Sequence, residues 1–244
     1  MNANKLLVKI IATGGSIAGV GPDRLDYILY PELGDHITID QSLARIPEVS
    51  DIARIDAEDL ISVGSTAIGG PEWLSLANRI NRTFREEPEV ACLVVTHGTA
   101  TLEETAYFLH QTVKTDKPVV ITVAMRRPTF LGTDPDLHLL GPVRVAACPE
   151  AAGMGVLTVL NSEIHCGRDV TKANTFRVET FRPNELGFLG YADSDGKVVF
   201  YRAPIRKHTT ATPFNVSESS VLPRVDIVYS YGGADGLLVN AVRA

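Results

Sequence analysis

Short apolar runs rich in β-branched residues alternate with longer amphipathic segments along much of this 244-residue chain. Strands that alternate with helices are expected to form a mostly parallel sheet with right-handed crossovers. Such strands are buried on both faces and therefore read as continuous apolar runs. The predicted fold class is α/β, a mostly parallel sheet with helices on both faces. The predicted strands are Leu6–Thr13, Leu60–Gly64, Val90–Thr96, Pro118–Ala124 and Gly155–Leu160.

Two segments between these strands carry apolar residues at helical spacing. Pro71–Arg85 begins with a proline, which suits the first turn of a helix. In Thr101–Val113, Thr101 and Glu104 have the spacing of a capping box, in which each side chain bonds to the backbone of the other residue. Glu103 and Glu104 are assigned to the N-terminus of that helix, where negative charge is favourable.

The character of the sequence changes near residue 204. We predict an N-terminal α/β domain over residues 1–204, a polar linker with several prolines over 205–223 and the beginning of a second α/β domain over 224–244. Val198–Tyr201 is predicted to be a strand of the first domain, and Val225–Tyr229 a strand of the second. One strand and a partial helix cannot bury a core. The last segment is therefore expected either to dock on a partner or to belong to a domain that this chain does not complete.

Composition and charge exclude several classes of partner. Lys+Arg 23 against Asp+Glu 29 gives a net charge of −6, which argues against nucleic acid or an anionic membrane surface. No apolar run approaches the ~18–20 residues that a membrane span requires, and Lys9 interrupts the first apolar run, unlike a signal peptide. Cys92, Cys148 and Cys166 have no CxxC spacing, so neither a disulfide framework nor a metal site is expected. A cytoplasmic location is therefore expected.

Three hydroxyl-rich segments follow three predicted strands, namely Ala12–Gly19, Gly64–Thr66 and Thr96–Thr101. In an open α/β sheet, ligands bind beyond the carboxyl ends of the strands. Any one segment has an ordinary explanation, because Ser and Thr cap helices and Gly forms turns. Three of them at one edge predict a pocket lined by hydroxyl groups. His97, within the third segment, is interpreted as a packed or hydrogen-bonded histidine.

The glycines after the first strand do not form a nucleotide-binding motif. Ser16 stands where the dinucleotide pattern needs its second glycine, and Val20 stands in place of the phosphate-loop lysine. Hydroxyl chemistry remains, and a serine or threonine hydroxyl needs activation to act as a nucleophile. Lys172 could supply it, because a buried lysine beside hydroxyls can lose its proton and act as a base. Spacing alone would equally fit an exposed lysine in a polar loop.

Several motifs, in order, resemble the bacterial asparaginase/glutaminase family. The resemblance implies an amidohydrolase that converts L-asparagine to L-aspartate and ammonia, with no cofactor and as a homo-oligomer, a dimer or tetramer. Several ordered motifs together are highly specific. They are Thr13–Ala18, Thr96–Ala106, Lys117–Val120, Ala124–Arg126 and Gly167–Asn174, followed by Arg206–Thr209 and Thr212–Phe214.

The resemblance also implies the catalytic residues. Ser16 is at the nucleophile position, where the family usually has a threonine. Tyr27 corresponds to the tyrosine of the mobile loop that closes over the nucleophile and polarises its hydroxyl. Thr99 corresponds to the second hydroxyl and Lys172 to the lysine that activates it. A backbone N–H at Gly98 or Thr99 is expected to stabilise the oxyanion.

The expected substrate-binding residues are Ser65, Thr66, Gly98 and Ala100. Ser65 corresponds to a serine that holds the α-carboxylate of the substrate. Ala100 stands where the family has an aspartate that binds the α-ammonium and supports the lysine, and Thr66 replaces a glutamine that also contacts the ammonium. An acidic residue that the family supplies from a neighbouring subunit has no counterpart in this chain. All three differences concern one group of the substrate.

Two alternatives to a conventional L-asparaginase follow from these differences. The substrate could be an amide without a free α-amino group, because a neutral wall suits a neutral substrate end. Alternatively, the chain is a degenerate, truncated member of the family that binds a small amide, or only assembles, without turnover. Retention of Ser16, Tyr27, Thr99 and Lys172 together favours an enzyme.

Overall fold

The computed structural model describes residues 5–28, 35–218 and 220–242. Its main sheet has eight strands in the order β10-β9-β6-β5-β4-β3-β1-β2. Neighbours from β2 to β5 are parallel, whereas β6, β9 and β10 extend the sheet with antiparallel pairing. The prediction of a mostly parallel sheet is confirmed. The strands are β1 Leu7–Gly14, β2 Arg54–Val63, β3 Val90–Thr96, β4 Val119–Thr122, β5 Val156–Leu160, β6 Glu163–Cys166, β9 Gly190–Ala192 and β10 Val198–Phe200.

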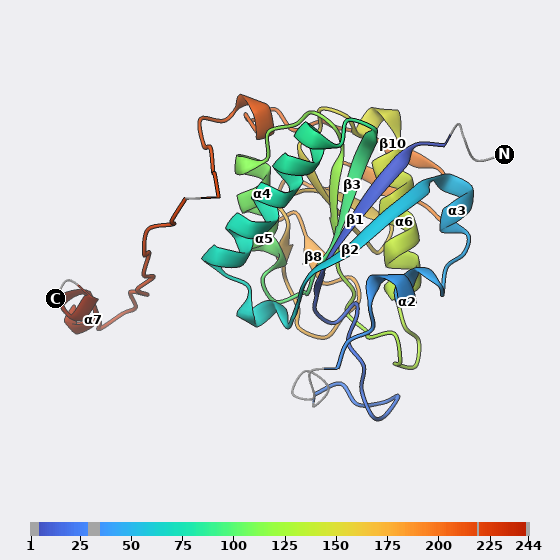
Figure 1. Cartoon of the computed structure of the whole chain (residues 1–244). Coiled ribbons are helices and arrows are strands. Elements are labelled where there is room, and N and C mark those ends of the chain that lie inside the picture. The colour runs from blue at the N-terminus through green and yellow to red at the C-terminus, as the bar shows by residue number, and fades with distance from the viewer. Residues whose placement is uncertain (1–4, 29–34, 219, 243–244) are drawn as a thin grey trace.

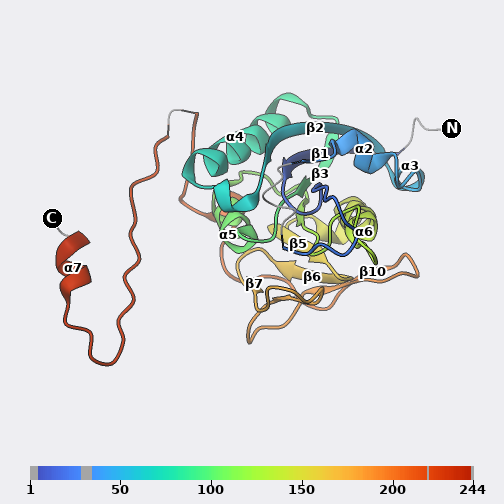
Figure 2. The ribbon, with the colours of Figure 1, turned by 90° about the horizontal axis from the view of Figure 1, so that it is seen from below.

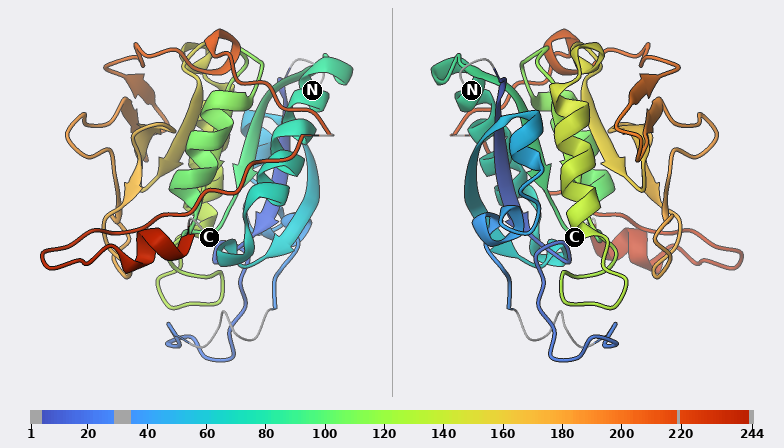
Figure 3. Two further views of the ribbon diagram at one scale, coloured as in Figure 1. Left: turned by 90° about the vertical axis from the view of Figure 1, so that its left-hand side faces the viewer. Right: turned by 90° about the vertical axis from the view of Figure 1, so that its right-hand side faces the viewer.

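Helices cover both faces of this sheet, as predicted (Figure 1). On one face lie α4 (Gly70–Glu86) and α5 (Leu102–Thr112), and on the other lies α6 (Pro135–Ala147) with the short helices α2 (Ile39–Leu43) and α3 (Val49–Ile52) (Figure 3). None of the helices in the described part of the chain combines the length and apolarity that crossing a membrane requires.

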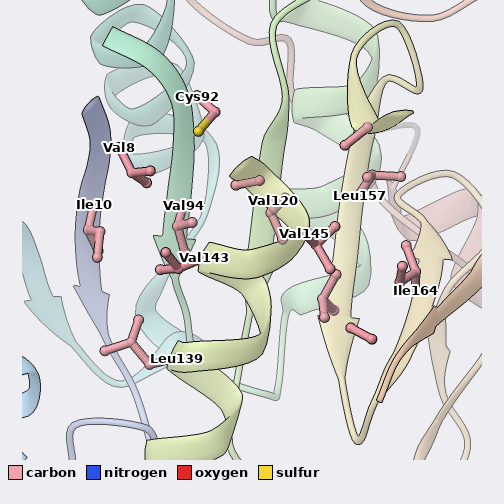
Figure 4. Close-up of a cluster of buried hydrophobic side chains, with 14 of the residues drawn as sticks. Val8, Ile10, Cys92, Val94, Val120, Leu139, Val143, Val145, Leu157 and Ile164 are labelled. Carbon is pink, nitrogen blue, oxygen red and sulfur yellow. The ribbon is translucent and has the colours of Figure 1, made fainter. Parts of the chain in front are cut away.

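Successive residues of the central strands point to opposite faces and build two cores. In β3, Val94 contributes to the core beneath α6, and Leu93 and Val95 contribute to the core beneath α4 and α5. Leu139 and Val143 of α6 pack onto the first of these cores (Figure 4). The central strands therefore bury both faces, which explains their continuous apolar sequence.

Several elements differ from the sequence prediction: β6, β9, α2 and α3 were not predicted, and β2 and α6 show the physical reasons. β2 runs over Arg54–Val63 rather than Leu60–Gly64, and none of its residues is buried. It is an edge strand, so the apolar pattern marked only its end. Helix α6 was not predicted, because eight of its thirteen residues are buried over a wide arc and Pro142 lies inside it. Its sequence therefore lacks the one-sided spacing of a surface helix.

The predicted linker is attached to the domain at more than one point. Val216 packs against the core beneath α4 and α5, and Glu218 pairs with Arg82. Lys114 holds the start of the segment. The Lys114 ammonium, at the end of α5, donates hydrogen bonds to the carbonyl oxygens of Thr209 and Thr212 at 2.8 and 3.0 Å. Both threonines are buried. This part of residues 205–223 is therefore packed against the α/β domain.

The segment after the linker runs away from the domain (Figures 1 and 2). The prediction of a strand at Val225–Tyr229 is wrong for the described structure, in which this segment has no strand partner. Val225, Ile227 and Tyr229 are 78%, 79% and 82% exposed, and α7 (Leu237–Val242) has no buried residue. The division into residues 1–204, 205–223 and 224–244 stays a prediction; residues 1–4, 29–34, 219, 243 and 244 lie outside the described part.

The turn that ends β1 yields a stability prediction. Gly14 has φ +85°, and a Cβ there would lie 2.6 Å from the carbonyl oxygen of Val63. Gly196 has φ +86°, but nothing lies within 4 Å of its Cβ position. Gly196→Ala is therefore expected to cost only the left-handed backbone, about 1–2 kcal/mol. Gly14→Ala should cost clearly more, because backbone must move.

Urea denaturation of the two variants, followed by the fluorescence of Trp73, the single tryptophan, measures this difference. Equal losses of unfolding free energy in the two variants would show that the Val63 carbonyl does not crowd a side chain at position 14.

Candidate active site

Three loops meet where β1, β2 and β3 end. A Cβ on Gly15 would lie 2.3 Å from Cα of Gly98, and a Cβ on Gly98 would lie 2.5 Å from Oγ of Ser65. Real Cβ atoms do not approach other atoms so closely, so no side chain fits at either glycine. Because β1 lies between β2 and β3 in the sheet, these glycines allow the loops on both sides to come together.

A cavity of about 210 Å³ opens among these loops. It is smaller than the ~300–1,000 Å³ pockets that hold drug-sized ligands, so it suits a small molecule. Ser16, Ser65 and Thr99 line it, and the hydroxyl-rich pocket predicted from the strand ends is present. Thr66 and Ala100 line it as well. The remaining lining residues are Gly15, Gly19, Asp35, His36 and Gly64.

The Ser16 hydroxyl is held by the fourth parallel strand. Ser16 is buried, and its Oγ donates a hydrogen bond of 2.5 Å to the carbonyl oxygen of Ala124, just beyond β4. Serine lacks the methyl group that restricts the rotamer of a threonine. The bond to Ala124 therefore supplies an orientation that the side chain alone does not impose.

Lys172 is not among the residues that line the cavity, but it reaches the lining residue Thr99 from a small second sheet. This sheet pairs β7 (Thr171–Lys172) with β8 (Phe181–Arg182). The Lys172 Nζ donates a hydrogen bond of 2.9 Å to Oγ1 of Thr99. Burial lowers the pKa of Lys172 below its ordinary value, and the negative charge of Glu103 opposes this shift. A lowered pKa makes a lysine a better base near neutral pH.

Ser65 is fixed to the loop after β3 by two hydrogen bonds. The Ala100 backbone N–H donates to Ser65 Oγ at 3.0 Å, and Thr101 Oγ1 donates to the Ser65 carbonyl at 2.7 Å. Ser65 thus accepts a bond and keeps its own O–H to donate. The capping box predicted for Thr101 and Glu104 is wrong, because the Thr101 hydroxyl serves this contact and makes no cap bond to α5.

A hydrogen-bonded chain fixes the turn at Gly98. The Gly98 carbonyl can only accept, so His97 Nδ1 carries the proton and donates to it at 2.8 Å. The Nε2 of the neutral ring therefore accepts from the Thr105 hydroxyl at 3.0 Å, and Thr105 Oγ1 in turn accepts from Trp73 Nε1 at 2.8 Å. Burial lowers the pKa of His97 to about 4. This geometry agrees with the interpretation of His97 as a hydrogen-bonded histidine.

The structure does not bring Tyr27 to Ser16. Tyr27 is not among the residues that line the cavity. Its hydroxyl donates a long hydrogen bond of 3.4 Å to the Phe176 carbonyl, and its ring meets Phe130 edge-on at 4.7 Å between centroids. A catalytic role for Tyr27 stays a prediction.

The loop that carries Tyr27 is fastened by Arg127. Arg127 is only 1% exposed, and its guanidinium donates hydrogen bonds to the backbone carbonyls of Asp23 and Asp26. The Leu131 N–H donates to the Arg24 carbonyl at 3.0 Å. The loop before Tyr27 therefore rests on the segment between β4 and α6.

Sequence reasoning missed three residues beside the site. Asp35 and His36 line the cavity because their backbone pairs with Gly19 and Val20, and no local pattern signals this pairing. Glu103 lies in the first turn of α5, as assigned, and it also accepts hydrogen bonds from β7. The sequence feature that could have pointed to Glu103 is its position, with Glu104, just after the hydroxyl-rich segment Thr96–Thr101. Among the described residues, no group of three or more His, Cys, Asp or Glu side chains could hold a metal ion.

Comparisons with known proteins identify relatives along nearly the whole chain. Residues 7–206 match the family described as "Asparaginase, N-terminal". L-asparaginase 2 of Bacillus subtilis is 43% identical over 234 residues, which cover 96% of this chain and 61% of that protein. L-asparaginase 2 of Escherichia coli is 41% identical over 237 residues, which cover 96% of this chain and 66% of that protein. The chain therefore spans less than two thirds of the length of both relatives.

The fold is also similar to a solved structure. The crystal structure of a probable cytoplasmic L-asparaginase from Campylobacter jejuni matches with a TM-score of 0.91 and 37% sequence identity. The match covers 98% of this chain and 71% of that chain.

Two buried histidines predict that the fold loses stability in mild acid. Burial lowers the pKa of His97 and of His110 to about 4, from 6.5. Between these values the unfolded chain binds protons that the folded chain does not. The free energy of unfolding should therefore be unaffected by these groups above pH 6.5. It should fall as the pH is lowered toward 4, by about 1.4 kcal/mol per pH unit and histidine at most.

Urea denaturation at pH 7, 6 and 5 measures this slope. An unfolding free energy that stays level over this range would contradict neutral, buried states for both histidines.

Proposed function

Because the chain belongs to the asparaginase family, we propose that it hydrolyses the side-chain carboxamide of L-asparagine to L-aspartate and ammonia. The observation that carries the proposal is the hydrogen bond from Lys172 to Thr99, at the cavity that Ser16 also lines. A lysine with a lowered pKa beside hydroxyl groups suits acyl transfer through a hydroxyl nucleophile. The names of the relatives support L-asparagine as the substrate.

Ser16 is the nucleophile in this proposal. Its Oγ attacks the carboxamide carbon, and its proton passes through the Thr99 hydroxyl to neutral Lys172. The C–N bond then breaks, and the leaving nitrogen takes this proton from Lys172 and departs as ammonia. Water hydrolyses the Ser16 ester, which releases L-aspartate and restores the hydroxyl. The lowered pKa of Lys172 favours the neutral form that the first step requires.

Other residues of the cavity bind the substrate. A backbone N–H at Gly98 or Thr99 stabilises the oxyanion, in a turn that His97 holds. The free O–H of Ser65 binds the α-carboxylate. If Tyr27 polarises the nucleophile, its loop must change conformation when the substrate binds, since its hydroxyl here contacts Phe176.

The α-ammonium of the substrate needs an anionic partner. Thr66 and Ala100 line the cavity without charge, and Asp35 is the acidic residue among its described lining. We therefore assign Asp35 to the ammonium. This assignment favours L-asparagine over an amide that lacks an α-amino group.

The proposal also covers the need for a cofactor, the location of the protein and its assembly. The mechanism uses only side chains and backbone of this chain, so the activity requires no cofactor. The word "cytoplasmic" in the name of the Campylobacter jejuni protein supports a cytoplasmic location. Assembly as a dimer or tetramer is proposed from the family alone, and light scattering of the purified chain measures it.

Substitution of the nucleophile tests the reaction. Ser16→Ala should lower ammonia release from L-asparagine by a factor on the order of 10⁴ or more. Ser16→Thr keeps the hydroxyl and should remain active. Turnover that survives in Ser16→Ala would exclude Ser16 as the nucleophile. A folded wild-type chain that releases no ammonia would favour the degenerate family member.

Substitutions at the ammonium site test the substrate. The wild-type chain should prefer L-asparagine to L-glutamine and to succinamate, which is asparagine without its amino group. Asp35→Asn should raise KM for L-asparagine about tenfold, the equivalent of ~1.4 kcal/mol, and leave KM for succinamate unchanged. Ala100→Asp should lower KM for L-asparagine only. A wild-type preference for succinamate would select the substrate without an amino group.

A further inference from the structure

The Glu103 carboxylate holds the strand that carries Lys172. Its Oε2 accepts one hydrogen bond from the Lys172 backbone N–H and one from Thr171 Oγ1, each at 2.6 Å. Glu103 lies in the first turn of α5, the helix that begins just after Thr99. One helix terminus therefore places both partners of the hydrogen bond between Lys172 and Thr99.

We infer that Glu103 is a positioning residue for Lys172. The Glu103 carboxylate fixes the β7 backbone so that Lys172 Nζ reaches Thr99, and it places one negative charge beside the Lys172 ammonium. This inference rests on the proposed function, in which Lys172 is the base. β7 has only two residues and one partner strand, so the sheet alone gives it little support. The two bonds to Glu103 supply the missing anchor.

The negative charge of Glu103 acts on the Lys172 pKa from a side chain that is hydrogen-bonded to β7. Glu103 raises the pKa of Lys172 against the larger effect of burial, which lowers it. It is the charged side chain that the structure shows bonded to β7. The other charged residues on elements packed around β7 are Glu104 of α5, Arg168 and Asp169 of the preceding loop, and Arg182 of β8.

Two substitutions separate the anchor from the charge. Glu103→Gln keeps an oxygen that accepts both hydrogen bonds but removes the negative charge. The Lys172 pKa should then fall further, so the rise of kcat/KM with pH should occur at lower pH, with kcat nearly unchanged. Glu103→Ala removes the anchor as well, and kcat should fall on the order of tenfold to a hundredfold.

Glu104 provides the matched control. It lies in the same turn of α5, carries the same charge and is exposed. Glu104→Gln and Glu104→Ala should leave both kcat and the pH profile unchanged. A shift in Glu104→Gln as large as that in Glu103→Gln would show a general effect of helix charge and would overturn the specific role of Glu103.

A second readout does not depend on turnover. The rate at which Lys172 is acetylated by acetic anhydride, relative to Lys5, follows its neutral fraction and can be measured by peptide mass spectrometry across pH. The midpoint for Lys172 should lie at lower pH in Glu103→Gln than in the wild-type chain. An unchanged midpoint overturns the inference. Absence of ammonia release with a shifted midpoint would instead reject the proposed function and leave the role of Glu103 intact.

Discussion

The contact between the Gly15 and Gly98 backbones is the constraint on which the site depends. A Cβ on Gly15 would lie 2.3 Å from Cα of Gly98, so the loops after β1 and β3 approach more closely than any side chain would permit. The cores fix the spacing of the strands, and the glycines allow their ends to converge beyond that spacing. The hydroxyls of Ser16, Ser65 and Thr99 consequently share one small cavity. Hydrogen bonds to the Ala124 and Gly98 carbonyls and from Thr101 to Ser65 then hold the loops in place.

The sequence predicted the buried parts of the fold better than its edges. β3 begins and ends at the predicted residues, because a strand covered on both faces has a continuous apolar sequence. The edge strand β2 was predicted at half its length, since its exposed residues carry no apolar signal. Val225–Tyr229 has the composition of a strand, but a strand also requires a partner, which composition cannot supply. Helix α6 was missed for the opposite reason, because it is buried over a wide arc and its apolar residues do not show the one-sided periodicity of a surface helix.

The sequence predicts those residues of the site that lie in the loops at the carboxyl ends of the parallel strands. Ser16, Ser65 and Thr99 lie at one edge because parallel strands end together. Lys172 was a candidate base from its residue type, and the resemblance to known sequences decided between that role and an exposed lysine, which spacing left open. Contacts between distant segments were not predictable in this way. The roles of Asp35 and Glu103 depend on backbone pairing and side-chain direction, which neither spacing nor composition encodes.

The burial of Arg127 joins two loops that are far apart in the sequence. Its guanidinium is almost wholly enclosed and depends on the carbonyls of Asp23 and Asp26, while Tyr27 packs against Phe130 of the same segment. A buried cation that loses its acceptors is strongly unfavourable. Residues 21–28 and 127–131 therefore form a single exchangeable module. A chimera that takes the tyrosine loop from a relative must take the arginine segment from the same parent. Recombination between the two segments would separate the buried guanidinium from the carbonyl groups that accept its hydrogen bonds.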